Sequence, residues 1–335
     1  MLTHLAIGAA GIVVLVTGGE LLVKGAAALA RGMGISPLVV GLTVVAFGTS
    51  APELAVSVEA ALTDSGTLAF GNIFGSNMAN IGLIIGLAAV LHPLPIDHLV
   101  IRRELPMMLL ALAAALAMAF DVDLGERRDA YARSDGLVLL LFFFVFIYYT
   151  LGDLGKRRTN VNGTESHGIA SIWAAGVRQP EGTGRILTNV LLIVVGLAGL
   201  IYGANLVVRG GVGAARAMGV PEVVVGLTLI AIGTSLPELA ATLSAVRRNN
   251  IGLAVGGVVG SNIFNTLLIT GVASTINPMP IPLWGHMDLV ATAILSLSLF
   301  FVARTHDQRI IRYEGLALLA LWSTYVIARS FFLPH

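Results

Sequence analysis

Two short segments of the chain carry the same acidic motif. Residues 46–55 read AFGTSAPELA and residues 231–240 read AIGTSLPELA, so eight of ten positions are identical at an offset of 185 residues. Each copy places a glutamate, Glu53 or Glu238, inside a long apolar stretch, where a carboxylate is costly unless something binds it. A duplicated acid of this kind predicts an ion transporter with two related halves.

Neutral oxygen-bearing side chains accompany each glutamate. Helical spacing places Thr49 and Ser50 on the same face as Glu53, and the next apolar stretch carries Gly-Ser-Asn-x-x-Asn, with Ser76 four residues before Asn80. The second copy repeats these four positions as Thr234, Ser235, Ser261 and Asn265. Carboxylate, amide and hydroxyl oxygens are hard ligands, which suit Ca²⁺ and Na⁺ and not soft metals.

A proline precedes each glutamate by one residue. Pro52 and Pro237 cannot donate a backbone hydrogen bond, and each pushes away the carbonyl four residues earlier, at Gly48 or Gly233. Free carbonyls at membrane depth are tolerated only where they face protein, water or an ion. We therefore expect a proline-broken helix beside the site in each copy.

The composition indicates the membrane setting of these motifs. Of 335 residues, 56% are hydrophobic and 12% are charged, which is far too apolar for an ordinary soluble domain. The chain has no cysteine, so disulfides and thiolate metal sites are excluded. We expect an all-α polytopic membrane protein in a lipid bilayer, with no nucleic-acid partner and no obligate protein partner.

Apolar stretches of helical length predict ten membrane spans. Their approximate bounds are 3–23, 37–62, 68–91, 105–120, 137–151, 186–208, 222–246, 251–275, 288–303 and 314–333. With the N-terminus outside, most lysines and arginines fall on the inner side, including Lys156, Arg157 and Arg158. The prediction is a multi-pass protein of the cell (inner) membrane with both termini on the extracytoplasmic side.

The repeat divides the chain into two equal parts. The 185-residue register continues without a gap from about Leu21 to Pro95, so each half carries five spans. An odd number of spans gives the halves opposite orientations, which is an inverted-topology repeat. We expect a first five-helix repeat over 1–151, a cytoplasmic linker over 152–185 and a second repeat over 186–335. The signature helices are about 37–62 and 68–91, then about 222–246 and 251–275.

The paired Gly-Thr-Ser-x-Pro-Glu and Gly-Ser-Asn-x-x-Asn motifs resemble the α-repeats of the calcium:cation antiporter superfamily, in particular the prokaryotic sodium/calcium exchangers. This resemblance implies that Glu53 and Glu238 are calcium ligands, with Asn80 and Asn265 completing the set. It implies sodium sites at the hydroxyls and backbone carbonyls of Ala46, Thr49, Ser50, Ser76, Ala231, Thr234, Ser235 and Ser261. It also makes the first and sixth helices the sliding gate. Some members carry an aspartate at the position of Asn265, so this chain has two central carboxylates and not three.

The expected function is secondary active exchange of Na⁺ for Ca²⁺ by alternating access at a mid-membrane site. Na⁺ and Ca²⁺ are the transported ions, and no cofactor is expected. A Ca²⁺/H⁺ antiporter of the same superfamily is the alternative within the transporter class. A cation channel would need a continuous polar stripe, whereas the intramembrane polar residues gather in two short motifs. An enzyme is not expected, because all seven histidines fall in loops or near span ends.

Overall fold

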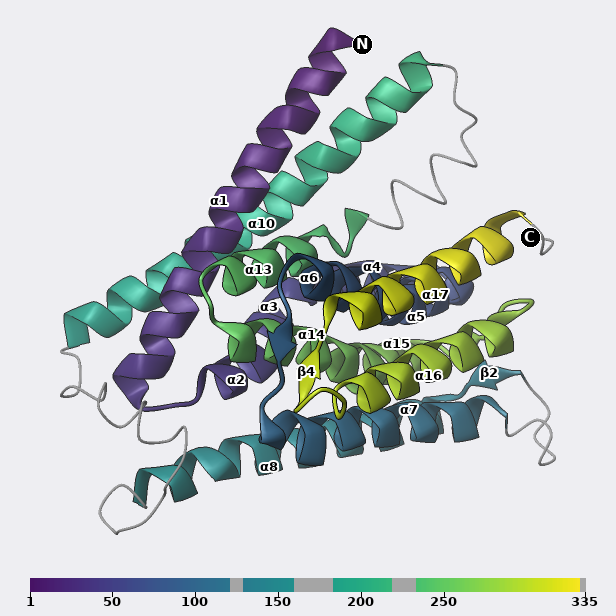
Figure 1. Ribbon diagram of the computed structural model, residues 1–335. Coiled ribbons are helices and arrows are strands. Elements are labelled where there is room, and N and C mark those ends of the chain that lie inside the picture. Colours follow the sequence, from purple (N-terminus) through teal and green to yellow (C-terminus); the bar gives the residue numbers. More distant parts are fainter. Residues whose placement is uncertain (121–128, 160–182, 219–232, 332–335) are drawn as a thin grey trace.

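The computed structural model describes residues 1–120, 129–159, 183–218 and 233–331, which are almost entirely helical (Figure 1). In the first half the helices are α1 (Leu2–Met33), α2 (Pro37–Val40), η1 (Gly41–Val45), α3 (Ala46–Thr49), α4 (Ala51–Leu62), α5 (Gly66–Ala79), η2 (Asn80–Ile85), α6 (Gly86–Leu91), η3 (Val100–Glu104), α7 (Leu105–Ala119) and α8 (Arg133–Thr159). In the second half they are α10 (Thr183–Ala217), α13 (Leu236–Arg247), α14 (Ile251–Ile263), η7 (Phe264–Ile269), α15 (Thr270–Ile276), α16 (Gly285–Val302) and α17 (Arg312–Phe331). The η elements are π-helical turns.

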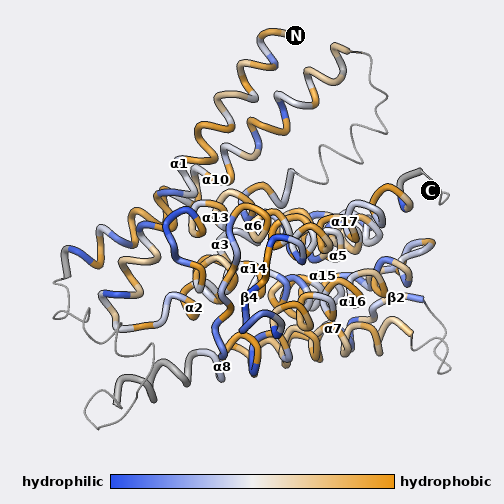
Figure 2. Tube along the Cα trace, viewed as in Figure 1, coloured by the Kyte–Doolittle hydropathy of each residue, from blue (hydrophilic) through white to orange (hydrophobic). Residues whose placement is uncertain are grey.

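Six described helices are long and apolar enough to cross a membrane, and a seventh span is formed if the bent pair Pro37–Thr49 and Ala51–Leu62 is one crossing. Hydrophobic residues follow α1, α10 and α7 along their length (Figure 2). The predicted count of ten is not confirmed. α7 is only 15 residues long, and residues 219–232 of the expected seventh span lie outside the described part of the chain.

The first span is longer than the sequence predicted. α1 continues past Lys24 and Arg31 to Met33, and Gly34 ends it in the left-handed conformation at φ 66°. α10 is similarly long, at 35 residues. Charged residues near a helix end reach the interface with long side chains, so they do not mark where the helix itself stops.

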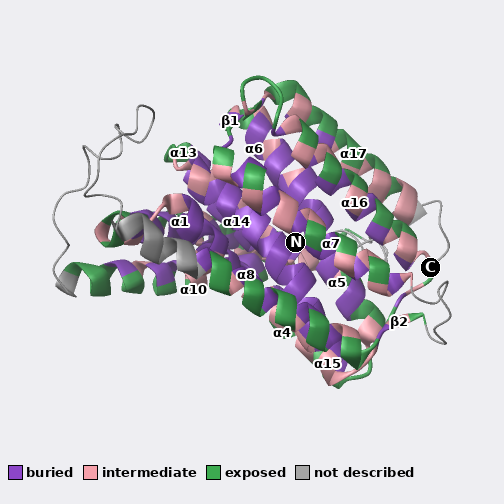
Figure 3. Cartoon of the chain, turned by 90° about the horizontal axis from the view of Figure 1, so that it is seen from below, coloured by how far each residue is buried: buried purple, intermediate pink, exposed green. Residues whose placement is uncertain are grey.

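Two continuous helical segments form the centre of the bundle. Buried residues make up 78% of the 18-residue apolar window of Gly66–Leu91 and 89% of that of Ile251–Ile276, but only 33% of that of α1. Figure 3 shows α14 enclosed in the middle, with exposed residues on the outer faces of α10, α8 and α17. The two Gly-Ser-Asn-x-x-Asn motifs therefore lie in the core.

α1 and α10 pack against each other through glycines. A Cβ atom on Gly11 would lie 2.6 Å from the backbone nitrogen of Val207, and one on Gly196 would lie 2.4 Å from that of Leu22. Any side chain at these positions would overlap the partner backbone, so the two helices are in backbone contact.

The two signature helices are broken at the same position. Ser50 has φ −82° and ψ 3°, and Ser235, its equivalent at the 185-residue offset, has φ −88° and ψ 2°. α4 and α13 begin directly after these serines, with Pro52 and Pro237 in their first turns. The break therefore precedes the proline, which occupies the first helical turn, where its missing N–H costs nothing. The helix axis bends by 45° across Ser50.

Short strands tie the two halves together at both ends of the bundle. β1 (Leu94–Pro95) pairs with β4 (Arg309–Ile310), and β2 (Ala130–Tyr131) pairs with β3 (Met279–Pro280), both antiparallel. The β1–β4 and β2–β3 pairs lie at opposite ends of α7 (Figure 1). β1 and β3 are equivalent at the 185-residue offset, so equivalent segments of the two halves lie at opposite ends.

Candidate ion-binding site

Glu53 lies against α5, in the first of the two central segments. It lies in the first turn of α4 and is 1% exposed. The Ser76 hydroxyl, on α5, donates to Glu53 Oε1 at 3.3 Å and lies 3.4 Å from the hydroxyl of Ser235 in the other half. One serine therefore contacts both copies of the acidic motif.

Glu238 also has its partner in the opposite half. It lies in the first turn of α13, is 4% exposed, and its Oε1 accepts a hydrogen bond from Ser50 Oγ at 3.4 Å. Thr49 and Glu238 line the same cavity. The turn at Ser50 lets the Ser50 side chain reach the second half. Helical spacing within the first motif predicts instead that Ser50 lies beside Glu53.

Several buried oxygens at this position have no hydrogen-bond partner among the described residues. They are Glu53 Oε2, Glu238 Oε2, Asn80 Oδ1, Asn265 Oδ1 and Ser261 Oγ. Buried polar atoms are normally paired, so a group of unpaired oxygens calls for a ligand. Oxygens of this kind, with two carboxylates, suit a hard cation.

A crossed network of asparagines positions part of this set. Asn80 Nδ2 donates to Asn262 Oδ1 at 2.9 Å, and Asn77 Nδ2 donates to Thr266 Oγ1 at 2.9 Å. Asn262 Nδ2 in turn contacts the Asn77 carbonyl at 3.4 Å. With its amide nitrogen occupied, Asn80 keeps its oxygen available for a cation. Asn77 and Asn262 thus hold the halves together.

Asn80 and Asn265 both lie in π-helical turns. Asn80 is the first residue of η2 and Asn265 the second of η7. The wider turn is visible at Thr270, whose hydroxyl donates to the carbonyl of Asn265 five residues earlier at 3.0 Å. π-helical turns occur frequently at functional sites.

The remaining predicted site residues occupy less direct positions. Ala46 is fully buried, and a Cβ on Gly260 would lie 2.7 Å from its side chain, so α14 lies directly against it. The Thr49 hydroxyl donates to the Val45 carbonyl at 3.0 Å. Thr234 is partly buried one residue before Ser235. Ala231 lies outside the described residues.

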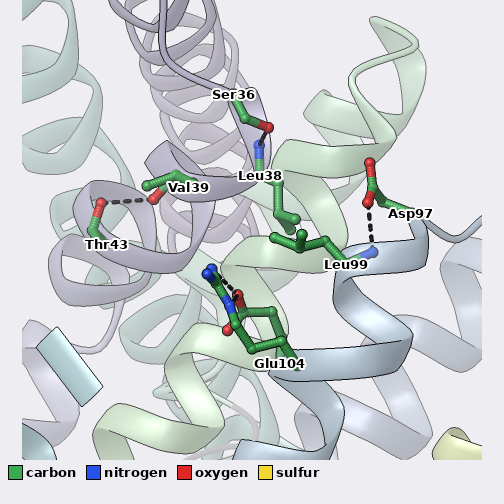
Figure 4. Close-up of polar contacts among 8 residues, drawn as sticks. Ser36, Leu38, Val39, Thr43, Asp97, Leu99 and Glu104 are labelled. Carbon is green, nitrogen blue, oxygen red and sulfur yellow. Dashed lines mark hydrogen bonds and ion pairs between the residues drawn. The ribbon is translucent and has the colours of Figure 1, made fainter. Parts of the chain in front are cut away.

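A third buried carboxylate was not predicted. Glu104 ends η3, is 1% exposed and accepts a hydrogen bond from the Nε of Arg103 at 2.7 Å. Figure 4 shows this corner of the molecule, where Ser36 caps α2 and Asp97 caps the turn before η3. The adjacent guanidinium of Arg103 balances the charge of Glu104.

Two buried carboxylates, Glu53 and Glu238, belong to the candidate site. Within the described ranges, no group of three or more histidine, cysteine, aspartate or glutamate side chains converges. The donor set is two carboxylates supplemented by neutral oxygens, so a cation here would be held by few formal charges. Such a set suits an ion that must leave as well as bind.

Comparison with known proteins assigns a family to this arrangement. The family model described as "Sodium/calcium exchanger protein" matches residues 3–152 and 188–331. The sodium/calcium exchanger MaX1 of Methanosarcina acetivorans is 33% identical, covering 95% of both chains. The inner membrane protein YrbG of Escherichia coli is 35% identical, covering 89% of this chain and 87% of its own. A solved structure of the sodium-calcium exchanger NCX_Mj, soaked with Na⁺ and Ca²⁺, superimposes with a TM-score of 0.80 at 29% identity and covers 100% of both chains.

Proposed function

Because the chain belongs to the sodium/calcium exchanger family of multi-pass membrane transporters, which are not enzymes, we propose that it is a secondary active antiporter exchanging Na⁺ for Ca²⁺ by alternating access. The site is the buried oxygen cluster around Glu53 and Glu238. Na⁺ and Ca²⁺ are the cargo, and no cofactor takes part.

The observation that carries this proposal is the set of unpaired buried oxygens. Glu53 Oε2 and Glu238 Oε2 have no hydrogen-bond partner among the described residues, although both side chains are almost fully buried. Two carboxylates balance the charge of one Ca²⁺, and the amide oxygens of Asn80 and Asn265 add neutral ligands.

Exchange follows from shared ligands. Several Na⁺ ions at the hydroxyls and carbonyls around the glutamates compete with Ca²⁺ for the same carboxylates. An empty site leaves two carboxylates without a counter-ion in a low dielectric, which disfavours movement of the unloaded protein. Only ion-loaded forms therefore cross between the two access states, and this couples the two fluxes.

The sodium ligands are part of the proposal. We assign them to Thr49, Ser50, Ser76, Thr234, Ser235 and Ser261, together with the backbone carbonyls of Ala46 and Ala231. Ser50 and Ser76 already contact the opposite half, which supports a sodium set drawn from both motifs.

The proposed topology is two inverted five-helix repeats, 1–151 and 186–335, joined by a cytoplasmic linker, with both termini on the extracytoplasmic side. Its support is the equivalence of β1 and β3 at opposite ends of the bundle and the matching breaks at Ser50 and Ser235. The distribution of lysine and arginine supports this orientation.

Isotopic Ca²⁺ flux in proteoliposomes tests the function. We expect Ca²⁺ uptake driven by an outward Na⁺ gradient at clamped pH, and none driven by a K⁺ gradient alone. Uptake that follows a pH gradient and ignores Na⁺ would establish the alternative, Ca²⁺/H⁺ antiport, in which protonation of the glutamates replaces sodium binding. A flux far above carrier rates in single-channel recording would instead indicate a channel.

A further inference from the structure

The asparagine contacts between the two halves are not symmetric. Asn80 Nδ2 donates to Asn262 Oδ1 at 2.9 Å. At the 185-residue offset, the equivalent contact would join Asn265 Nδ2 to Asn77 Oδ1. Both of these atoms are buried, and neither has a hydrogen-bond partner among the described residues. Of two equivalent hydrogen bonds, one is therefore formed and the other is open.

Thr266 accounts for the open bond. Its hydroxyl accepts a hydrogen bond from Asn77 Nδ2 at 2.9 Å, and both side chains are almost fully buried. The equivalent residue in the first half is Ile81, which has no hydroxyl, and there the Asn262 amide donates to a backbone carbonyl at 3.4 Å. The bond to Thr266 fixes the direction of the Asn77 amide, so its oxygen is not presented to Asn265.

Asn265 is held by its backbone and not by its side chain. Thr270 donates to the Asn265 carbonyl at 3.0 Å, a bond that the equivalent Ile85 cannot make. The side-chain nitrogen and oxygen of Asn265 both lack a partner among the described residues, whereas only the oxygen of Asn80 does. Because the terminal torsion of an asparagine is broad, the Asn265 amide can turn while its backbone stays in place.

We propose that Thr266 is a positioning residue of the ion site, which takes the amide of Asn77 and so leaves Asn265 as the unfixed one of the two amide ligands. The proposal deepens the proposed function and rests on it for the identity of the ion. Binding of a cation then includes the cost of ordering Asn265, whereas Asn80 is ordered beforehand. Such a site holds Ca²⁺ less tightly than one with two fixed asparagines, which favours release in each transport cycle.

Removal of the Thr266 hydroxyl tests the proposal. Thr266→Val keeps the shape of the side chain and frees Asn77 to turn its oxygen to Asn265, as Asn262 does to Asn80. We expect isothermal titration of the purified protein with CaCl₂ to show binding tightened on the order of threefold to tenfold, the net value of one hydrogen bond. Thr266→Ser keeps the hydroxyl and should bind as the unaltered protein does. Damage to the fold would weaken binding, so a gain in affinity distinguishes positioning from a structural role.

The gain should act through Asn265. We expect Thr266→Val to leave the Ca²⁺ affinity within about twofold in an Asn265→Ala protein, where no amide remains to be fixed. Thr292→Val is the matched control, because Thr292 is a buried threonine on α16 whose hydroxyl donates to the Asp288 carbonyl at 2.8 Å, and it should leave the affinity unchanged. An equal gain in the Asn265→Ala protein, or no gain in the unaltered background, would overturn the proposal.

Thermal unfolding in choline chloride, without Na⁺ or Ca²⁺, tests the hydrogen bond apart from the ions. Asn80→Ala breaks a bond, so it should lower the midpoint on the order of 2 °C more than Asn265→Ala, which breaks none. In the Thr266→Val background, Asn265→Ala should become as destabilising as Asn80→Ala. The same small effect of Asn265→Ala in both backgrounds would contradict the proposal. A protein that shows this coupling but no Na⁺-driven Ca²⁺ flux would keep the positioning role of Thr266 and lose only the ion assignment.

Discussion

The Ser50 hydroxyl donates to Glu238 Oε1 at 3.4 Å across a sequence separation of 188 residues. The contact places a side chain from the first motif directly on the carboxylate of the second. Ser76 adds a second link between the halves, since it contacts Glu53 of its own half and Ser235 of the other. The hydroxyls of Ser50 and Ser76 therefore link the two motifs directly.

Removing the charge of either central glutamate should abolish exchange. We expect Glu53→Gln or Glu238→Gln to lower Na⁺-driven Ca²⁺ flux at least about a hundredfold, because changes even to groups behind metal ligands cost 10- to 100-fold. Glu59→Gln is the matched control, since Glu59 is exposed on the same helix. Normal flux in the Glu53→Gln protein would exclude Glu53 as a ligand.

Ca²⁺ should stabilise the folded protein, because it binds a site assembled only on folding. At about a hundred times its Kd, a ligand adds about 2.7 kcal/mol to the unfolding free energy. We expect Ca²⁺ to raise the midpoint of thermal unfolding, and Na⁺ at high concentration to reduce this shift by competition. A Ca²⁺ shift that persists in the Glu53→Gln, Glu238→Gln double variant would place the binding elsewhere.

Asn262 should affect ion affinity without contacting the ion. Its Oδ1 accepts from Asn80 Nδ2 at 2.9 Å, which orients the Asn80 oxygen. We expect Asn262→Ala to weaken Ca²⁺ binding about tenfold in isothermal titration, as loss of a group behind a ligand typically does. Asn277→Ala is the control, because Asn277 bonds Asp64 at the surface at 2.9 Å, and it should bind Ca²⁺ normally.

The contact between α1 and α10 should tolerate no added volume at its closest points. A Cβ on Gly11 would lie 2.6 Å from Val207 N, whereas one on Gly8 would meet only the Cα of Gly210, at 3.9 Å. We expect Gly11→Ala to destabilise the protein by about 1–3 kcal/mol through overpacking, and Gly8→Ala to be nearly neutral. Thermal unfolding of the two variants in the same detergent makes the comparison, and equal midpoints would refute backbone contact at Gly11.

The sequence by itself determined the membrane class, the two acidic motifs and the pairing of equivalent residues at a fixed offset. These features are local or repetitive: a carboxylate in an apolar stretch is costly wherever the chain folds, and a duplicated motif is visible without coordinates. Glu53, Glu238, Asn80 and Asn265 were predicted for this reason, and all four are buried with an unpaired oxygen among the described residues.

Only the tertiary structure decided which residues meet. Ser50 was expected beside Glu53 from helical spacing, but the break at Ser50 directs its hydroxyl to Glu238. The roles of Asn77 and Thr266 likewise depend on partners 189 residues away. Periodicity describes one helix at a time, whereas these contacts are set by how two central segments pack against each other. The repeat predicted that the halves correspond, and their packing decided that Ser50 of the first motif contacts the carboxylate of the second.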